Sequence, residues 1–379
     1  MKVLLIGNRE HQLLFNLIDE IKDDREDISF DIFSQDSNSI AEENRKYYNE
    51  ITNLGLPQIL LKNRIVRGVS KQIAFRNKLK KLFKKEYDYV HVHYIEDIIL
   101  RDVEFFISRL NTKLVISVWG SDFLRASNVK REQMRKLFKL CSKITISNAL
   151  VIEAFKDYYE GEDFCNNIVM LKFFVKPLND LIVGYESNKH LIAKQELGID
   201  TSKIVLTIGY NASRMQQHLL IFDELFRDNE FMSYKDKIHL VAPLTYPKDK
   251  EYIESIKSKL EESGFSYSIF TNFLSNDELL RLRYSSDVFV QLQTTDMMSG
   301  SMLEYLALGN LVITGSWLPY SELLDGGIIF TTINSISELP KELLKVDLLN
   351  LDKILSNGLA VESIFGRSEL INKWIEVYD

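Results

Sequence analysis

The sequence predicts an α/β protein with two successive domains, each a parallel sheet covered by helices. Short apolar runs that end in Gly, Asp, Ser or Asn alternate with longer amphipathic stretches along the chain. Strands and helices that alternate in this way form parallel sheets buried on both faces. The alternation starts afresh near residue 200, and a chain of 379 residues is long for a single hydrophobic core.

In the first half, five apolar runs have the length and residue types of buried strands. A helix is predicted over 10–24, after the first run, because apolar residues recur at helical spacing from Leu13 to Ile21. These elements make up the predicted first domain, residues 1–180. The five runs are KVLLIG (2–7), ISFDIF (28–33), YVHVHY (89–94), KLVISVWG (113–120) and KITISN (143–148).

The second half repeats this organisation without a detectable sequence repeat. A helix over 189–200 closes on Gly198, and five further runs follow with helical stretches between them. We expect two Rossmann-like domains that face a cleft, the second covering residues 181–358. A last helix within 359–379 has no strand after it and is expected to pack back on the first domain. The strand runs are 203–213 with its loop, 237–244, 267–274, 287–293 and 310–316.

Composition excludes several classes of function. The formal net charge of -7 argues against nucleic acid as a partner, because phosphate binding needs a surplus of basic residues. Cys141 and Cys165 make no metal or disulfide framework, which is typical of a reducing cytoplasm. The apolar run at the start of the sequence is too short for a signal peptide. The sequence has no run of about twenty apolar residues, so no membrane span is predicted. We expect a soluble, cytoplasmic chain.

Ligands of open α/β sheets lie beyond the carboxyl ends of the strands, next to helix N-termini. The stretch TTDMMSGSMLEYLALGN follows a predicted strand and precedes a helix. Ser299, Gly300 and Ser301 then present free amides to an anion such as a diphosphate, and glycine permits close approach. Glu304, one turn into the helix, is placed to bind a ribose, and Asp296 is placed to face a sugar. The alternative is a serine-capped helix with incidental acids.

Three further loops of the second domain join this candidate donor site. In GYNASRMQQH, Gly209 ends the first strand, and Arg214 and His218 are candidate partners for phosphate. Asn211 and Ser213 either contact the donor or simply cap the next helix, and His218 is alternatively a half-buried helix histidine. Other donor-binding candidates follow the next two strands, namely Pro243, Tyr246 and Phe273.

The first domain carries the candidate acceptor site. In VWGSDFLR, Gly120 permits a tight turn and Asp122 offers a carboxylate as a base or hydroxyl ligand. Trp119 either stacks on a sugar face or fills the core. His93 and His11 are further candidates for the acceptor hydroxyl, and the alternative is that they line the core or the cleft. His91 and His93 alternate along one strand, but no third metal ligand is evident. Asn8 and Ser121 complete the acceptor-binding candidates.

Several motifs are absent from the sequence. No D-x-D pair occurs, so we expect no metal and no cofactor, with amides and basic side chains taking the leaving-group charge. There is also no G-x-x-x-x-G-K-[ST], G-x-S-x-G or G-x-G-x-x-G, which removes the main support for kinase, hydrolase and ordinary NAD-dependent functions.

One segment stands out by its charge. Residues 62–86 carry ten Lys or Arg and a single acid, Glu86. Phe75, Leu79, Leu82 and Phe83 share one helical face. A basic amphipathic helix of this kind suits an anionic membrane surface or a lipid-diphosphate acceptor. The alternative is a solvated helix that packs its apolar stripe on the sheet.

The second domain's motif resembles a known family. Asp296 and Glu304, around a small-residue turn, resemble the E-x7-E motif of the retaining GT-B glycosyltransferases, which have twin domains and a terminal helix. The resemblance implies that Asp296 lies by the donor sugar and Glu304 binds the nucleotide ribose. The first position is Asp in this chain and Glu in the family.

A narrower set of motifs resembles the lipid-linked-sugar 4-acetamidofucosyltransferases, which use a TDP-activated sugar. Trp119, Gly120, Ser121 and Asp122 match a W-G-[AS]-D loop. The other matches are Asn211, Ser213 and His218 to a G-N-S…H loop, and Pro243, Tyr246 and Pro247 to a P-x-x-Y-P segment. FLSNDELLRL is also similar. The resemblance spans most of the chain through short motifs.

The predicted function is therefore metal-independent glycosyl transfer at the inner membrane face, in the assembly of a cell-surface polysaccharide. The donor is a nucleotide diphosphate-sugar bound by the second domain, and the acceptor is a lipid-linked or other oligosaccharide bound by the first. Asp122, His11 or His93 serves the acceptor hydroxyl, and retention of configuration follows from the resemblance alone. The alternatives are a nucleotide-sugar 2-epimerase and a non-catalytic GT-B-like partner protein.

Overall fold

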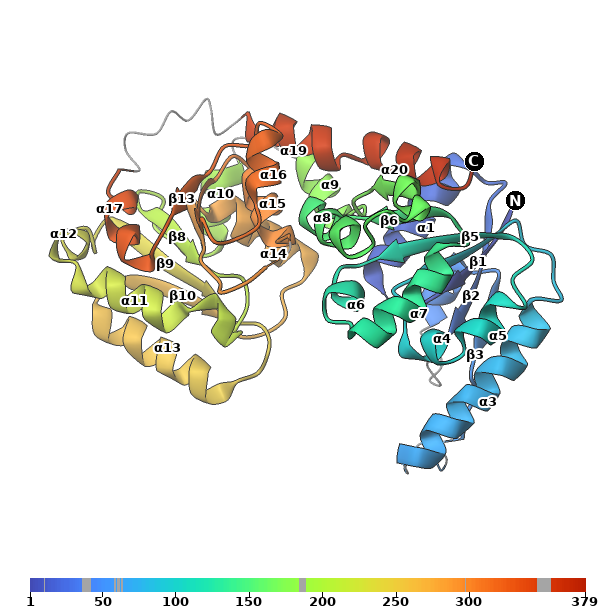
Figure 1. Cartoon of the computed structure of the whole chain (residues 1–379). Helices are drawn as coiled ribbons and strands as arrows, with labels where there is room; N and C mark the ends of the chain where they lie inside the picture. Colours follow the sequence, from blue (N-terminus) through green and yellow to red (C-terminus); the bar gives the residue numbers. More distant parts are fainter. Residues whose placement is uncertain are drawn as a thin grey trace. The chain divides into compact units, whose positions relative to one another are not determined.

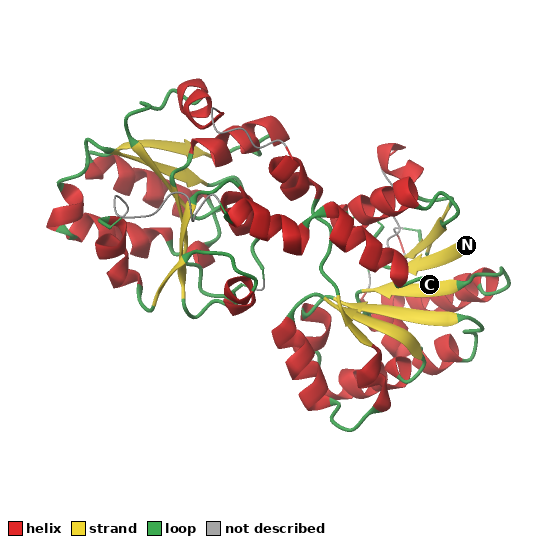
Figure 2. Cartoon of the chain, turned by 90° about the horizontal axis from the view of Figure 1, so that it is seen from above, coloured by secondary structure: helices red, strands yellow, loops and turns green. Residues whose placement is uncertain are grey.

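A computed structural model describes residues 1–9, 11–35, 42–57, 59, 62, 64–183, 189–296, 298–345 and 356–379. The chain divides into two compact units. The first comprises Met1–Phe174 together with Arg367–Asp379, and the second comprises Val175–Gly366. In each unit a sheet lies between layers of helices (Figure 1 and Figure 2). Among the described residues, no helix combines the length and hydropathy needed to cross a bilayer.

The sheet of the first unit has the order β3-β2-β1-β4-β5-β6-β7 in the described residues, with every neighbouring pair parallel. Alternate side chains enter opposite layers, as a pleated strand requires. In β1, Leu4 and Ile6 pack with α3, α7 and α8, whereas Val3 and Leu5 pack with α1 and the C-terminal helix α20. The strands are β1 (Lys2–Ile6), β2 (Ser29–Ser34), β3 (Glu50–Asn53), β4 (Tyr89–His93), β5 (Lys113–Val118), β6 (Cys141–Ile146) and β7 (Ile168–Met170).

Two of the helices of the first unit, α1 and α3, lie in the stretches over 10–24 and 62–86 that the sequence marked as helical. The helices of this unit are α1 (Gln12–Asp24), η1 (Glu42–Tyr47), α3 (Arg64–Leu82), α4 (Asp97–Arg101), α5 (Val103–Ile107), α6 (Ser121–Leu124), α7 (Asn128–Phe138), α8 (Ala149–Tyr158), η2 (Asp163–Asn167) and α20 (Arg367–Glu376). Helix α20 packs on this unit through Ile371 and Trp374, and the Trp374 Nε1 donates to the Lys172 carbonyl at 2.9 Å.

The second unit repeats the plan with the order β10-β9-β8-β11-β12-β13, again parallel throughout the described residues. Val290 of β11 faces the layer of α11, α13 and α17, while its neighbour Phe289 faces α15 and α19. The strands are β8 (Ile204–Ile208), β9 (Ile238–Pro243), β10 (Ser266–Phe270), β11 (Val288–Gln291), β12 (Leu311–Gly315) and β13 (Thr331–Ile333).

Helices of the second unit fill the connections between these strands. They are α9 (Lys176–Val183), α10 (Lys189–Glu196), η3 (Arg214–Gln216), α11 (His218–Arg227), α12 (Asn229–Met232), α13 (Lys250–Ser263), α14 (Asn276–Ser285), α15 (Gly300–Ala307), α16 (Ser321–Asp325), η4 (Ile336–Glu338), α17 (Leu339–Leu343) and α19 (Asn357–Phe365). The last predicted helix is thus preceded by a separate one. Helix α19 ends before Gly366 in the second unit, and α20 belongs to the first.

All ten predicted strands are present, and the described residues add β3, β7 and β13. The added strands have four, three and three residues, so their sequences carry too few alternations to be recognised. Each lies at or next to the end of its sheet order. The predicted fold class, two Rossmann-like parallel-sheet units, is confirmed for each unit.

Candidate functional site

Strand order changes direction once in each sheet. The change falls between β1 and β4 in the first unit and between β8 and β11 in the second. Crevices of doubly wound sheets open at such a switch point, beyond the carboxyl ends of the strands. The loops and helix starts that follow three of these strands, β1, β8 and β11, contain twelve of the twenty sequence-predicted site residues.

In the second unit, the loops after β8 and β11 are joined by hydrogen bonds. Backbone N–H of Thr294 donates to the Met215 carbonyl at 2.9 Å, and the Gln217 side chain donates to the Leu292 carbonyl at 2.6 Å. Below them, Gln216 Nε2 donates to Gln293 Oε1 at 2.8 Å. Two loops that are far apart in sequence therefore behave as one surface.

Helix α15 begins on this surface. Ser299 is its N-cap, and its Oγ accepts from the Met302 N–H at 3.1 Å. A Cβ added at Gly300 would meet nothing within 4 Å, so the start of the helix is open on that side. The free amides of a helix N-terminus attract anions. Ser301 is turned elsewhere, because its Oγ accepts from Arg283 at 3.0 Å.

Glu304 lies one turn further along α15 in a buried ion pair. Arg283 of α14 donates from Nε to Glu304 Oε2 at 2.8 Å and from Nη1 to the Tyr305 hydroxyl at 2.8 Å. The exposed fractions of the two side chains are 4% for Arg283 and 10% for Glu304. Both also line a narrow pocket of about 30 Å³ with Asn276 and Asp180. Sequence reasoning missed Arg283, because it lies inside a helix and follows no strand.

Asp296 is held by a chain of hydrogen bonds that runs from Gln291 through Tyr320. The hydroxyl of Tyr320 donates to its Oδ2, and Gln291 Nε2 donates to the same hydroxyl at 3.4 Å. Burial, reinforced by the nearby Asp296 carboxylate, raises the pKa of Tyr320, so the phenol keeps its proton. Tyr320 follows β12 by several residues, and no sequence motif marked it. Asp296 is partly exposed. In the sequence it comes three residues before Ser299 and four before Gly300.

In the loop after β8, Ser213 caps η3, and Asn211 makes a local turn that ends at Ser213. Asn211 Oδ1 accepts from the Ser213 N–H at 2.8 Å, and Ser213 Oγ accepts from the Met215 N–H at 3.3 Å. Arg214 is exposed, stacks over Tyr252, and pairs through Nε with Asp249 Oδ2 at 2.9 Å. Its guanidinium reaches solvent and remains a candidate contact for phosphate.

His218, a candidate phosphate partner with a half-buried helix histidine as the alternative, lies inside the second unit. Its imidazole is fully buried, and burial lowers its pKa to about 4, so the ring is neutral at pH 7. The ring lies behind Gly209, where an added Cβ would be 2.8 Å from His218 Nε2. Gly209 also has φ +64, a conformation that favours glycine. The histidine therefore supports the loop from inside, and its burial removes it from direct contact with a ligand in this conformation.

Pro243 ends β9, and the exposed rings of Tyr246 and Phe273 stack with centroids 5.6 Å apart and planes 7° apart. Backbone N–H of Ala212 donates to the Tyr246 carbonyl at 2.6 Å, which attaches this aromatic pair to the loop after β8. The structure thus joins the loop of Gly209 to the loops of Tyr246 and Phe273 on one side and to the loop of Asp296 and Ser299 on the other.

In the first unit, Asp122 is not the exposed carboxylate that the sequence suggested. It is buried and accepts from three backbone amides, those of Ile95 at 3.1 Å, Trp119 at 3.0 Å and Phe123 at 3.2 Å. Burial raises its pKa despite these bonds. The carboxylate ties the loop after β4 to the loop after β5. Asp122 therefore has a structural role in this loop. Its carboxylate is buried and bonded to backbone amides, so it is not accessible as a base.

An aromatic cluster lies at the switch point of the first unit. His11 meets Trp119 edge-on with centroids 4.5 Å apart, and Phe173 lies 4.7 Å from Trp119. Beneath them, neither ring nitrogen of buried His93 has a hydrogen-bond partner within the described residues, nor has Trp119 Nε1. Burial lowers the pKa of His93 to about 3, helped by nearby His11, so a neutral imidazole faces this cluster.

His91 stands apart from the candidate site. It exchanges hydrogen bonds with the Tyr378 hydroxyl at 2.7 Å and Ser117 Oγ at 2.8 Å, so the C-terminal segment closes the layer under the cluster. Gly120, at φ +93, turns the chain into α6, which begins at Ser121. Asn8 is exposed after β1. Within the described residues, no group of three or more His, Cys, Asp or Glu is arranged to hold a metal ion.

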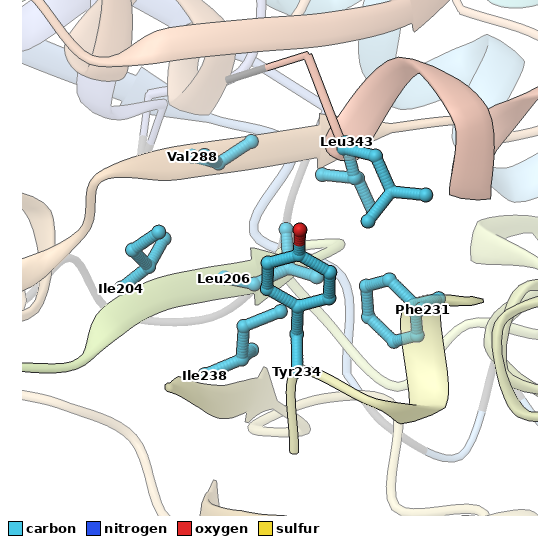
Figure 3. Close-up of a pocket in the computed structure, with 8 residues that line it drawn as sticks. Ile204, Leu206, Phe231, Tyr234, Ile238, Val288 and Leu343 are labelled. Carbon is cyan, nitrogen blue, oxygen red and sulfur yellow. The ribbon is translucent and has the colours of Figure 1, made fainter. Parts of the chain in front are cut away.

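A separate apolar pocket lies at the opposite edge of the second sheet. Its lining includes Ile204, Ile238 and Val288, each the first residue of its strand (Figure 3). Figure 3 shows these side chains converging with Tyr234 below Leu343. Because ligands of such sheets bind at the carboxyl ends, this pocket does not belong to the candidate site.

The first unit matches a known sequence family. Residues 2–152, less than half of the chain, match the family described as Glycosyl transferase 4-like. No curated protein matches the chain at a significant level.

Solved structures resemble the whole chain in fold. A glycosyltransferase from Rickettsia africae has 13% identity and a TM-score of 0.72, covering 100% of this chain and 97% of its own. The Anabaena protein HepE in complex with UDP has 12% identity and a TM-score of 0.73, with 99% of each chain covered. Sucrose-phosphate synthase from Thermosynechococcus elongatus has 11% identity and a TM-score of 0.68, covering 100% and 98%.

At these identities the neighbours establish the fold, which is the GT-B fold that the sequence predicted. The family match of residues 2–152 supports the predicted class of enzyme, a glycosyltransferase. The narrower resemblance to 4-acetamidofucosyltransferases stays a prediction, as do the roles of the individual site residues.

Proposed function

We propose that this protein transfers a sugar from a nucleoside diphosphate-sugar, bound by the second unit, to a glycan acceptor bound by the first. The observation that carries the proposal is the start of α15. There the open amides at Gly300 stand one turn before Glu304, on the surface formed by the loops after β8 and β11. HepE is described in complex with UDP and with UDP-glucose, which supports a nucleotide of this type.

The donor is oriented by charge and hydrogen bonding. Its diphosphate lies over the amides of Ser299, Gly300 and Ser301, where the helix dipole favours negative charge. Glu304 uses only Oε2 toward Arg283 in the described structure, so a carboxylate oxygen remains to accept from ribose hydroxyls. The narrow pocket beside Glu304 admits a hydroxyl but no whole ribose, so the sugar ring lies over its mouth.

Transfer breaks the bond between the anomeric carbon and the diphosphate oxygen and forms a bond to the acceptor oxygen. The leaving diphosphate gains charge, which the α15 amides and exposed Arg214 stabilise. Asp296, held by Tyr320, contacts the donor sugar. Metal independence rests on the absence of a D-x-D pair from the sequence, and retention of configuration on the resemblance of Asp296 and Glu304 to E-x7-E.

The acceptor site is the aromatic cluster of the first unit. Trp119 and Phe173 are partly exposed rings suited to an apolar sugar face, and His11 stands at their edge. Burial lowers the pKa of His11, so its imidazole is neutral and can accept a hydroxyl proton. His11 is partly exposed and is therefore favoured over His93, which is buried, and over Asp122, whose oxygens are occupied by backbone amides.

The acceptor is lipid-linked, and α3 docks the first unit on an anionic membrane surface. The apolar face predicted from sequence, with Phe75, Leu79 and Leu82, is buried against the unit. A second row remains exposed on the amino-terminal half of α3, which extends beyond the rest of its unit (Figure 1). The exposed fractions in this row are 42% for Val66, 57% for Val69 and 56% for Ile73. Exposed apolar residues among lysines and arginines favour an interfacial helix.

Calorimetry with UDP, TDP, GDP and CMP tests the donor site. One nucleotide should bind the wild type, and Glu304→Gln should weaken that binding about 10-fold or more, because charged hydrogen bonds to ribose are lost (~1.5–3 kcal/mol). Glu254→Gln, an exposed acid on α13, is the matched control and should leave affinity unchanged. Absence of binding for every nucleotide, or equal affinity for Glu304→Gln, would refute the donor assignment.

A further inference from the structure

A second groove opens at the carboxyl edge of the second unit, among residues that the donor and acceptor sites do not use. It lies between the start of α11, the loop after β11 and the segments after β12 and β13, and its volume is about 420 Å³. That volume is within the usual range of small-molecule sites. Its lining includes Leu220, Thr294, Trp317, Ser335 and Ser337.

Trp317 is fixed in place as a platform. Its Nε1 donates to the Gln293 carbonyl at 2.9 Å, which leaves no polar atom of the ring unsatisfied. The indole lies directly against Gly315, where an added Cβ would be 2.4 Å from the ring, so any larger residue there would displace it. Even so, 39% of Trp317 remains exposed. An aromatic ring held rigidly at the surface loses little entropy when a ligand stacks on it.

The remaining lining combines polar side chains with Leu220 and Ile336 and carries no positive charge. Ser335 and Ser337 exchange a hydrogen bond at 2.9 Å, and Glu224 and Gln217 add acceptors and a donor. No Lys, Arg or His is among the described residues that line the groove. A phosphate or nucleotide would need cations or free amides, so this chemistry favours a neutral ligand rich in hydroxyls. Leu220, 46% exposed, supplies an apolar surface beside the hydroxyl groups.

We propose that this groove binds one or two uncharged sugar residues of a glycan, with Trp317 stacked on the C–H face of a pyranose ring. The inference rests on the proposed function, since transfer to a glycan supplies the ligand. The groove is joined to the loop of Asp296, because Trp317 bonds to Gln293 and Thr294 N–H bonds to Met215. A sugar in the groove is thus held by the same loop that carries the candidate sugar-contact acid, and the second unit contributes to glycan selection.

Saturation-transfer NMR with a panel of neutral disaccharides built from glucose, galactose and N-acetylhexosamine tests this site. At least one disaccharide should receive saturation from the wild type, and Trp317→Ala should weaken its binding at least fivefold. Ser337→Phe provides a second variant, because it fills the groove from an exposed position without removing core packing. Leu359→Ala, at a 73% exposed apolar position on α19, is the matched control and should bind as the wild type does.

Competition separates this site from the donor site. A saturating nucleotide should leave disaccharide binding to the wild type unchanged, and Trp317→Ala should retain nucleotide affinity in the calorimetric panel. If the wild type binds no nucleotide, the proposed function is refuted. The disaccharide experiments with the wild type and the two variants then decide by themselves whether the groove binds sugar. The groove proposal is overturned if no disaccharide binds, if Trp317→Ala and Ser337→Phe both bind like the wild type, or if nucleotide displaces the disaccharide.

Discussion

The guanidinium of Arg283 and the carboxylate of Glu304 form an ion pair that is almost wholly shielded from solvent, with Nε and Oε2 2.8 Å apart. The pair joins α14 to α15 and fixes the residue that the sequence marked for ribose binding. A carboxylate oriented in this way needs no rearrangement before a ligand hydroxyl reaches its second oxygen.

Removing one partner of this pair should lower the free energy of unfolding more than replacing both partners by apolar residues. Arg283→Met leaves Glu304 buried without its partner, and we expect a loss of about 3–5 kcal/mol in the free energy of unfolding. The double variant Arg283→Met, Glu304→Leu should lose clearly less, because both buried charges are removed together. Urea unfolding followed by circular dichroism measures both. Equal losses in the single and double variants would show that packing, and not charge pairing, dominates at this position.

Tyr320 should act on the donor sugar through Asp296. Tyr320→Phe keeps the buried ring and removes the hydroxyl that donates to Asp296. We expect unchanged affinity for the nucleoside diphosphate and about tenfold weaker binding of the matching nucleotide-sugar, because a charged hydrogen bond that orients the carboxylate is lost. Asp296→Asn should reproduce the same separation. A Tyr320→Phe protein that binds nucleotide and nucleotide-sugar as the wild type does would exclude this positioning role.

The buried His218 should make stability depend on pH. Burial lowers its folded-state pKa to about 4, from about 6.5 for an exposed histidine. Between these values the unfolded chain binds more protons, so stability is present near pH 7 and is lost as pH falls, by about 1.4 kcal/mol per pH unit for this group. His218→Gln removes this titration. Although less stable at pH 7, the variant should show a shallower dependence of unfolding free energy between pH 6 and 5.

An unchanged slope in His218→Gln would mean that other groups carry the acid sensitivity. His93 and His239 are then the next residues to test, because burial lowers the pKa of each, to about 3 and about 4 respectively. Variants at all three positions, compared pairwise, assign the slope to individual rings.

The exposed row of α3 should bind anionic lipid. Val69→Ser with Ile73→Ser removes exposed apolar area that would enter the membrane interface. Lys80→Glu with Lys81→Glu reverses exposed charge, at about 1 kcal/mol for each charge near the surface. Both double variants should lose sedimentation with vesicles of phosphatidylcholine and phosphatidylglycerol. Val129→Ser, at a 71% exposed position on α7, should sediment as the wild type does. Undiminished sedimentation of both double variants would assign these residues to solvent.

Much of the fold could be read from sequence because its signals are local. Strands of five or six residues, such as those predicted over 28–33 and 143–148, stand out as apolar runs, whereas β3, β7 and β13 are too short to do so. The loops after strands were also found, because the carboxyl edge of a parallel sheet collects ligands whatever the side chains are.

The roles of individual polar residues were less accessible. Asp122 and Asp296 both follow strands in loops with small residues, and nothing in the sequence separates them. In the structure, one is closed off by the amides of Ile95, Trp119 and Phe123, and the other is held by Tyr320 with part of its surface open. Likewise, a histidine next to a glycine loop predicts a phosphate contact, but Gly209 lets the His218 ring fill the space behind it.

By itself, the sequence determined the strand and helix pattern, the restart into a second unit, and the Ser-Gly-Ser turn between two acids. These depend on residue periodicity and on backbone freedom, which act over a few neighbouring residues. Only the tertiary structure decided which carboxylates are open, that Arg283 pairs with Glu304, and that Trp317 lies on Gly315. Those outcomes depend on burial and on contacts between residues distant in the chain, and desolvation at such contacts sets charge and accessibility.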